Sequence, residues 1–175
     1  GCGMEGLLTV AALKTLGINK IIVIDKESEK SRAMEFGAWE FIGSHGKNGV
    51  AGVKGKIRAA AGDMADAVFI CTDSPMGRNV ARRFMKNSGS ICEMGFLCGW
   101  RRTPTARYFE DSMPAGGRFY AARDYENCMN FLAKAAEMKL PLYKLITHRY
   151  KLEEINEAMW TVVREEGLGI AVFNR

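Results

Sequence analysis

Three glycines at the start of the chain place the strongest constraint on its fold. Gly1, Gly3 and Gly6 form the pattern Gly-x-Gly-x-x-Gly, and a helical apolar pattern follows them as far as Gly17. In a strand-turn-helix unit the first glycine permits a tight turn, the second lets backbone approach a pyrophosphate, and the third lets helix and strand pack closely. The N-terminus of the helix then offers free N–H groups and a partial positive charge to phosphates. The motif is short, so its interpretation needs support from elsewhere in the sequence.

That support comes from an acidic residue at the end of the next apolar run. Lys20–Asp25 is the kind of short, continuously apolar run expected of a strand buried on both faces, and Asp25 lies 19 residues after Gly6. A carboxylate at this spacing accepts hydrogen bonds from both hydroxyls of an adenosine ribose and repels a 2′-phosphate, which predicts NAD rather than NADP. The alternative is a solvated strand end. Lys26 and Lys30 are candidates to flank the ribose, or are simply exposed.

The rest of the chain alternates apolar runs with helical patterns. The predicted helices cover residues 7–16, 28–36, 76–86, 124–138 and 152–164. The predicted strands are Lys20–Asp25, Ala38–Ile42, Ala67–Cys71, Ser90–Met94, Arg118–Ala122 and Ile170–Phe173. The glycine-rich segment from Gly43 to Gly55 is predicted to be a mobile connection. Strands that alternate with helices indicate an α/β domain with a mainly parallel sheet.

The composition excludes several classes of protein. The chain has 175 residues, 47% of them apolar, which argues against disorder and for a single domain by default. No apolar run approaches the roughly 20 residues of a membrane-spanning helix, and the first residues show no signal-peptide pattern. The formal charge is +5, with basic clusters in residues 78–86 and at 101–102. These clusters suit a nucleic-acid surface or a solvated helix face. The absence of any nucleic-acid motif favours the solvated face.

The cysteines and histidines predict a reduced, cytoplasmic protein without a metal site of its own. The five cysteines are an odd number without a Cys-x-x-Cys pair. They are Cys2, Cys71, Cys92, Cys98 and Cys128. His45 and His148 lie at no metal-ligand spacing from a cysteine. We interpret His148 as a hydrogen-bonded packing residue and His45 as a solvated loop residue, and no catalytic residue is predicted in this chain.

Two nucleotide-dependent classes share a glycine-rich turn with a ribose-binding acid. Methyltransferases that use S-adenosylmethionine have these features and usually carry a further acidic residue just before the glycines. That position precedes Gly1, so this pattern alone leaves both a dehydrogenase and a methyltransferase open.

Four longer stretches point to one of the two. They are residues 1–8, residues 22–30 with 35–38, residues 89–95 and residues 142–158. Together they resemble the zinc-type medium-chain dehydrogenases, the superfamily of alcohol, polyol and threonine dehydrogenases. The last stretch is the most specific, because Ile-Thr-His-Arg is followed by Leu-Glu-Glu-Ile-Asn-Glu-Ala, and it argues against a methyltransferase. The similarity spans the whole chain but matches only the cofactor-binding half of that family and its C-terminal return.

The resemblance implies a Rossmann fold and a set of cofactor contacts. The expected sheet is doubly wound and parallel with strand order 3-2-1-4-5-6, its first strand lying outside this chain. Residues 1–140 would be the NAD-binding Rossmann domain, and residues 141–175 a return segment packed toward a missing catalytic domain. The candidate cofactor-binding residues are Gly1, Gly3, Met4, Glu5, Gly6, Asp25, Lys26, Lys30, Cys71, Thr72, Met94, Gly95 and Phe96.

Three positions depart from the family pattern. Glu5 stands where the family usually has Val or Ile against the nicotinamide, and Asp73 replaces a usual glycine. Ala171 stands where many relatives have a basic residue near the phosphates. These departures put the pose of the nicotinamide and one charge contact in question.

The function implied by the resemblance is hydride transfer between an alcohol or polyol and NAD. A zinc ion supplied by an upstream catalytic domain would activate the alcohol. The same resemblance implies a homodimer or homotetramer, with dimers formed through the edge strand near Arg118–Ala122. The alternative hypothesis is a stand-alone nucleotide-binding or NAD-sensing module. We also expect upstream residues to supply a central strand between the strands that contain Ile21 and Val68.

Overall fold

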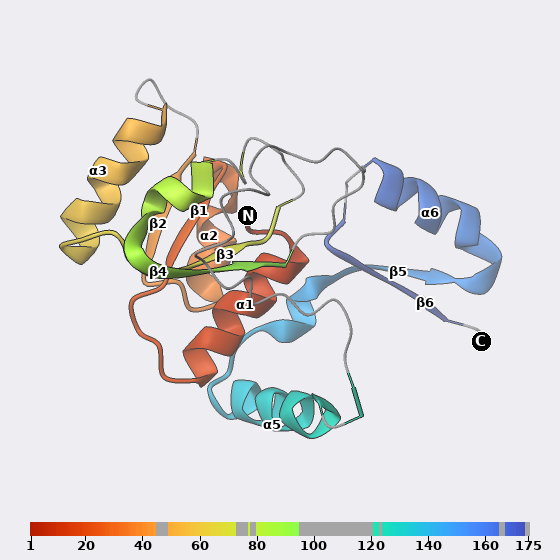
Figure 1. Ribbon diagram of the computed structural model, residues 1–175. Coiled ribbons are helices and arrows are strands. Elements are labelled where there is room, and N and C mark those ends of the chain that lie inside the picture. The colour runs from red at the N-terminus through yellow and green to blue at the C-terminus, as the bar shows by residue number, and fades with distance from the viewer. Residues whose placement is uncertain are drawn as a thin grey trace.

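The computed structural model describes residues 1–44, 49–72, 77, 80–94, 121–122, 124–164 and 167–173 (Figure 1). The α-helices are α1 Met4–Thr15, α2 Lys30–Glu35, α3 Gly49–Ala61, α5 Asp124–Glu137 and α6 Ile155–Val163. The strands are β1 Ile22–Asp25, β2 Glu40–Gly43, β3 Ala65–Ile70, β4 Met85–Glu93, β5 Ile146–Lys151 and β6 Gly169–Phe173. Short 3₁₀ turns are η1 Glu27–Glu29, η2 Arg82–Phe84, η4 Leu142–Leu145 and η5 Leu152–Glu154. The predicted α/β class with parallel strands is confirmed.

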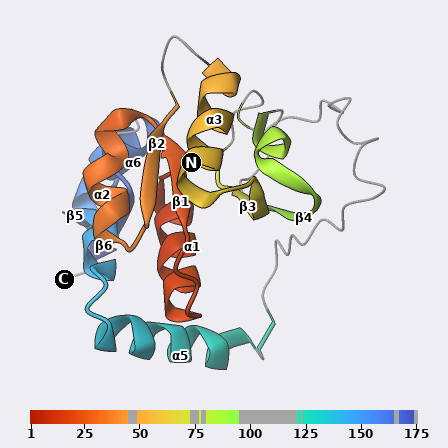
Figure 2. The same ribbon diagram turned by 90° about the vertical axis from the view of Figure 1, so that its left-hand side faces the viewer.

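Strands β1 and β2 are parallel and covered on both faces. Val23 lies beside Phe41, and Ile24 lies beside Ile42. Because successive side chains of a strand point to opposite faces, the first pair faces α1 and α2 while the second pair faces α3 (Figure 2). The continuous apolar run before Asp25 therefore has the buried environment on both sides that its composition predicted.

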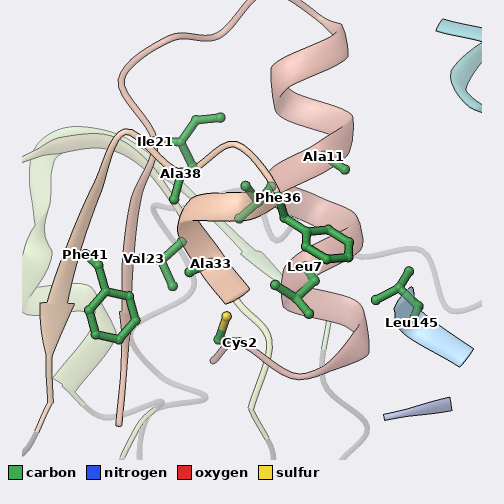
Figure 3. Close-up of a cluster of buried hydrophobic side chains, with 11 residues drawn as sticks. Cys2, Leu7, Ala11, Ile21, Val23, Ala33, Phe36, Ala38, Phe41 and Leu145 are labelled. Atoms are coloured by element: carbon green, nitrogen blue, oxygen red, sulfur yellow. The ribbon is translucent and has the colours of Figure 1, made fainter. Parts of the chain in front are cut away.

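The larger core cluster fastens the start of the chain to this pair of strands. Leu7 of α1 and Phe36, at the end of α2, are both fully buried there, and Figure 3 shows them side by side. Cys2 and Leu145 belong to the same cluster, so the glycine motif and the C-terminal segment share one core with β1 and β2. Packing of this kind holds the first residues of the chain in place relative to Asp25.

The predicted mobile connection between Gly43 and Gly55 is wrong over most of its length, because α3 begins at Gly49. Its buried residues Val53 and Ile57 pack on the second face of the β1–β2 pair. Each glycine inside a helix costs roughly 1 kcal/mol relative to alanine, whereas each buried Val or Ile contributes about 1.5–3 kcal/mol. Burial therefore outweighs the poor helix propensity of this segment.

Strands β3 and β4 form a second parallel pair, with Val68 beside Ile91. The predicted helix over 76–86 is wrong at its C-terminal end, since within the described residues the helix gives way to η2 and β4 begins at Met85. Phe84 is buried in the cluster under α3, and Lys86 reaches Asp66 on the neighbouring strand at 2.7 Å. The contact of Lys86 favours extended backbone from Met85 onward, where the basic residues had suggested a helix face.

The strands of the described residues form three two-stranded parallel sheets, β1–β2, β3–β4 and β5–β6. In the expected order 3-2-1-4-5-6, strand 1 lies outside this chain. The pair β1–β2 corresponds to strands 2 and 3 on one side of it, and the pair β3–β4 corresponds to strands 4 and 5 on the other side. Of the predicted strand Arg118–Ala122, only residues 121 and 122 are described, and neither is in a strand. The other predicted elements have bounds within three residues of those observed, except that β4 is longer.

The C-terminal part is a β5–α6–β6 unit that extends away from the first two pairs (Figure 1). Strand β5 was not predicted. The Tyr150 hydroxyl on β5 lies 2.8 Å from Thr161 Oγ1 on α6, which joins the helix to the strand beneath it. An ion pair between Lys144 and Glu35 of α2, together with buried Leu145, attaches the unit to the main core.

Within the described residues, no helix is both long and apolar enough to cross a membrane.

Candidate functional site

The glycine turn lies at the carboxyl ends of β1 and β3. The terminal amino group of Gly1 donates a hydrogen bond to the Ile24 carbonyl oxygen at 3.0 Å. A Cβ atom on Gly1 would collide with the carbonyl oxygen of Cys71, just after β3, and a Cβ atom on Gly6 would collide with the carbonyl oxygen of Gly1. Both positions therefore require glycine, because the backbone at Gly1 lies against Cys71 and the backbone at Gly6 lies against Gly1. This agrees with the tight turn and close packing expected of the first and third glycines of the motif.

Gly3 differs from the other two glycines because the space beside it is open. It is the N-cap of α1, with extended backbone (φ −70°, ψ −167°) and no side-chain cap. A Cβ atom there would meet no atom within 4 Å. Because the first-turn amides of a helix have no acceptor within the helix, this open space borders a set of N–H donors. A phosphate group fits this position, and the missing side chain leaves room for it.

The Asp25 carboxylate is held against the glycine turn. Its Oδ2 accepts the N–H of Cys2 at 2.5 Å, and its Oδ1 accepts the N–H of Lys26 at 2.6 Å. A carboxylate has about four acceptor positions, so two bonds leave it able to accept from a ligand. The half-buried carboxylate is thus fixed in orientation against the glycine turn.

Buried Cys2 is a structural neighbour of that carboxylate. Burial, reinforced by the negative charge of Asp25, raises the pKa of the Cys2 thiol to about 11. The side chain is 2% exposed and packs in the core cluster, so it is an un-ionised apolar residue at neutral pH. Its backbone contacts the site, and its thiol does not.

The two lysines behind Asp25 differ in their surroundings. Lys26 is exposed, and Lys30 Nζ lies 3.9 Å from Glu27 Oε1, one helical turn before it. Glu27 was not singled out from the sequence, although its position two residues after Asp25 and three before Lys30 was a usable signal. The local positive charge predicted from Lys30 is therefore partly balanced by a carboxylate.

Cys71 packs against the first turns of α1. Its Sγ lies 3.7 Å from Thr9 Oγ1, and that hydroxyl donates to the Glu5 carbonyl oxygen at 2.8 Å. Burial raises the pKa of Cys71, and the hydrogen bond with Thr9 partly offsets this rise. The Glu5 side chain itself is exposed. Thr9 thus couples the strand end to the helix, a contact that sequence patterns did not indicate.

Met94 occupies the end of the neighbouring strand. Its N–H donates to the Ile70 carbonyl oxygen at 2.9 Å, and its side chain is 45% exposed. Cys92 Sγ lies 3.6 Å from Met94 Sδ, and burial raises the pKa of Cys92. Gly95 and Phe96 lie outside the described residues. The carboxyl ends of β1, β3 and β4 thus place Asp25, Cys71 and Met94 along one edge, where ligands of open α/β sheets bind.

His148 lies away from this edge, on β5. Its Nδ1 is 2.9 Å from the hydroxyl of Thr147, and its ring stacks on Tyr150 with an interplanar angle of 7°. This environment agrees with a packing role. His45 and Asp73 lie outside the described residues, and Ala171 lies on β6 beside Arg149 of β5.

A metal site would need a cluster of ligands. The part of the chain that the structure describes contains no group of three or more His, Cys, Asp or Glu side chains able to hold a metal ion.

Comparison with known proteins agrees with this geometry. The sequence model of a family described as zinc-binding dehydrogenases matches residues 6–134. Sorbitol dehydrogenase 1 of Saccharomyces cerevisiae is 28% identical over 166 residues, which is 90% of this chain and 45% of that protein. The chain therefore spans about half the length of the curated relatives it matches.

Solved structures show the same fold. An alcohol dehydrogenase from Thermotoga maritima superposes with a TM-score of 0.86 at 20% identity, over 100% of this chain and 48% of that one. The short chain alcohol dehydrogenase rspB of Escherichia coli CFT073, in complex with the cofactor NADH, superposes with a TM-score of 0.69 at 19% identity over 99% of this chain and 50% of that one.

Proposed function

Because the chain belongs to the family of zinc-binding dehydrogenases, we propose that it is the dinucleotide-binding part of an alcohol or polyol dehydrogenase and that its dinucleotide is NAD. The observation that carries this proposal is the Asp25 carboxylate, which accepts the Cys2 N–H of the glycine turn at 2.5 Å. It joins a ribose-binding group to a phosphate-binding turn in one fixed arrangement. The E. coli relative that holds NADH and the yeast sorbitol dehydrogenase support the cofactor and the substrate class.

Each part of the site has a role in this proposal. The open space at Gly3 and the first-turn amides of α1 receive the pyrophosphate, and Asp25 accepts hydrogen bonds from the ribose hydroxyls. Lys26 flanks that ribose. Cys71, Thr72 and Met94, with Gly95 and Phe96, line the path toward the nicotinamide. When bound, the cofactor supplies hydride transfer at its nicotinamide ring.

The reaction needs more than this chain supplies. In this proposal a zinc-binding catalytic domain of the same polypeptide activates an alcohol or polyol, and residues 141–175 return toward it. An upstream strand leads into Gly1 and lies between β1 and β3, where the Gly1 nitrogen already contacts Ile24 and the Gly1 backbone lies against Cys71. The protein would act as a cytoplasmic homodimer or homotetramer without nucleic-acid or membrane partners.

The ribose contact can be tested with a matched pair of variants in the polypeptide that the gene encodes. Asp25→Asn removes the charge at the site and retains one oxygen acceptor, for the Cys2 N–H, while the acceptor for the Lys26 N–H is lost. Asp63→Asn makes the same change at the other end of the sheet, where Asp63 Oδ1 accepts the Met64 N–H at 2.7 Å. A hydrogen bond to a charged group contributes about 1.5–3 kcal/mol, so Asp25→Asn should weaken NADH binding roughly 10- to 100-fold. NADPH binding should weaken much less, because the repulsion of its 2′-phosphate is also removed.

Calorimetric titration with NADH and NADPH measures both affinities. Wild-type protein that binds the two dinucleotides equally, or loses no NADH affinity in Asp25→Asn, would contradict the proposal. Assays with sorbitol and simple alcohols separate the two hypotheses for the whole protein. Tight NADH binding with no oxidation of any alcohol would favour a nucleotide-sensing module.

A further inference from the structure

The carboxyl end of β2 carries a second carboxylate near the ribose-binding edge. A Cβ atom on Gly43 would collide with Glu27 Oε2, so the Glu27 carboxylate occupies the space where a side chain at position 43 would begin. Gly43 is the register partner of Asp25 in the parallel pair. Adjacent strands lie about 4.8 Å apart, and in-register side chains point to the same face. The Glu27 carboxylate therefore lies on the Asp25 side of the sheet, one strand away.

The same carboxylate is the ion-pair partner of Lys30. The distance from Lys30 Nζ to Glu27 Oε1 is 3.9 Å, and both side chains are more than half exposed. An exposed pair of this kind adds little to stability. Its effect is electrostatic, because Lys30 and exposed Lys26 are the basic residues that would attract a phosphate group to this edge, and Glu27 balances the charge of Lys30.

We propose that Glu27 is a second specificity-determining residue, which disfavours dinucleotides with a 2′-phosphate by adding a negative charge beside Asp25 and by balancing Lys30. This inference rests on the proposed function, since it concerns how the same site chooses between NAD and NADP. Asp25 acts through direct hydrogen bonds to the ribose. Glu27 acts at longer range, through its charge and through the space it fills over Gly43.

The test is Glu27→Gln in the polypeptide that the gene encodes, with NADH and NADPH as probes. Removing one charge about 5–8 Å from a phosphate dianion in a largely solvated site should tighten NADPH binding about three- to tenfold. NADH binding should change less than about twofold by the same reasoning, since the NAD ribose carries no charge at that position. Raising the ionic strength from about 0.05 to 0.5 M should remove most of the gain, because the Debye length falls well below 10 Å.

Glu40→Gln is the matched control. Glu40 lies at the opposite end of β2, where its carboxylate accepts the Phe41 N–H at 2.8 Å, and a glutamine oxygen can replace it. The control makes the same change in net charge and should leave both affinities unchanged.

The outcomes separate this inference from the proposed function. Wild-type protein that binds neither dinucleotide would overturn both. A preserved preference for NADH with no gain for NADPH in Glu27→Gln, or an equal gain in Glu40→Gln, would overturn only the role of Glu27. A salt-sensitive gain confined to NADPH and to Glu27→Gln would support it.

Discussion

A pair of glycine substitutions separates the two functions of the glycine turn. In Gly6→Ala the new methyl group collides with the Gly1 carbonyl oxygen, and backbone on at least one side must move. The Gly1 nitrogen then loses its bond to Ile24, and the Cys2 N–H loses its bond to the Asp25 carboxylate. One ordinary hydrogen bond contributes about 0.5–1.5 kcal/mol and one to a charged group about 1.5–3 kcal/mol, so unfolding should become easier by roughly 2–4 kcal/mol.

Gly3→Ala should behave differently. The new methyl group meets no protein atom within 4 Å, and a φ of −70° suits any residue. Alanine is a clearly poorer N-cap than glycine, but it also restricts the unfolded chain by a comparable free energy, so stability should stay within about 0.5 kcal/mol. The methyl group does, however, occupy the space assigned to the pyrophosphate, and NADH affinity should fall at least about tenfold, which corresponds to roughly 1.4 kcal/mol.

Urea unfolding and NADH titration measure the two effects on the same preparations. Gly6→Ala should lower both the free energy of unfolding and NADH affinity, and Gly3→Ala should lower only NADH affinity. The reasoning is refuted if Gly6→Ala is as stable as the wild type, because the backbone contact would then be unimportant. Equal NADH affinity in Gly3→Ala would show that no phosphate lies over that residue.

Three further outcomes are expected. Phe36→Ala should lower the free energy of unfolding by about 3–5 kcal/mol in urea titrations, since the ring is fully buried, whereas Phe173→Ala, at 48% exposed, should cost much less. The pKa of Cys2 is raised from 9.0 to about 11, so its contribution to stability is complete below pH 9 and is lost as the pH rises toward 11. That loss of stability should reach roughly 2–3 kcal/mol and should disappear in Cys2→Ala. In the native protein, an alkylating reagent at pH 8 should modify exposed Cys128 well before buried Cys2. Glu5→Val should tighten NADH binding in fluorescence titrations, because an apolar side chain suits the nicotinamide better than a carboxylate; unchanged affinity would mean that the carboxylate stays in solvent when the cofactor binds.

Local sequence patterns were sufficient to predict those features that depend on neighbouring residues or on a regular alternation of side chains. The run before Asp25 predicted a strand buried on both faces, and the spacing of the glycines predicted the close backbone approach now seen at Gly1 and Gly6. The position of Asp25 after that strand predicted an acid at the carboxyl edge of the sheet, next to the glycine turn. These features depend on residues close in sequence or on a strict alternation, so they can be recognised without a structure.

Tertiary contacts decided the rest. Helix α3 forms in a glycine-rich segment because Val53 and Ile57 are buried against β1 and β2, a gain that local propensity does not include. Phe84 and Lys86 leave the predicted helix because their partners lie on other elements, with Asp66 20 residues away from Lys86. The Glu27–Lys30 ion pair is different, because its partners are three positions apart and their spacing could have been recognised in the sequence.

The sequence alone predicted the groups that the proposed function assigns to a dinucleotide, namely a glycine turn, a helix N-terminus and the carboxylate of Asp25. Only the folded chain showed how that chemistry is held. The Cys2 N–H fixes the orientation of Asp25, and the register of β1 with β2 brings Gly43 and the Glu27 carboxylate beside it. The orientation of the Asp25 carboxylate depends on Cys2, and the position of the Glu27 carboxylate depends on Gly43. Both contacts join segments that come close only after β1 and β2 have paired.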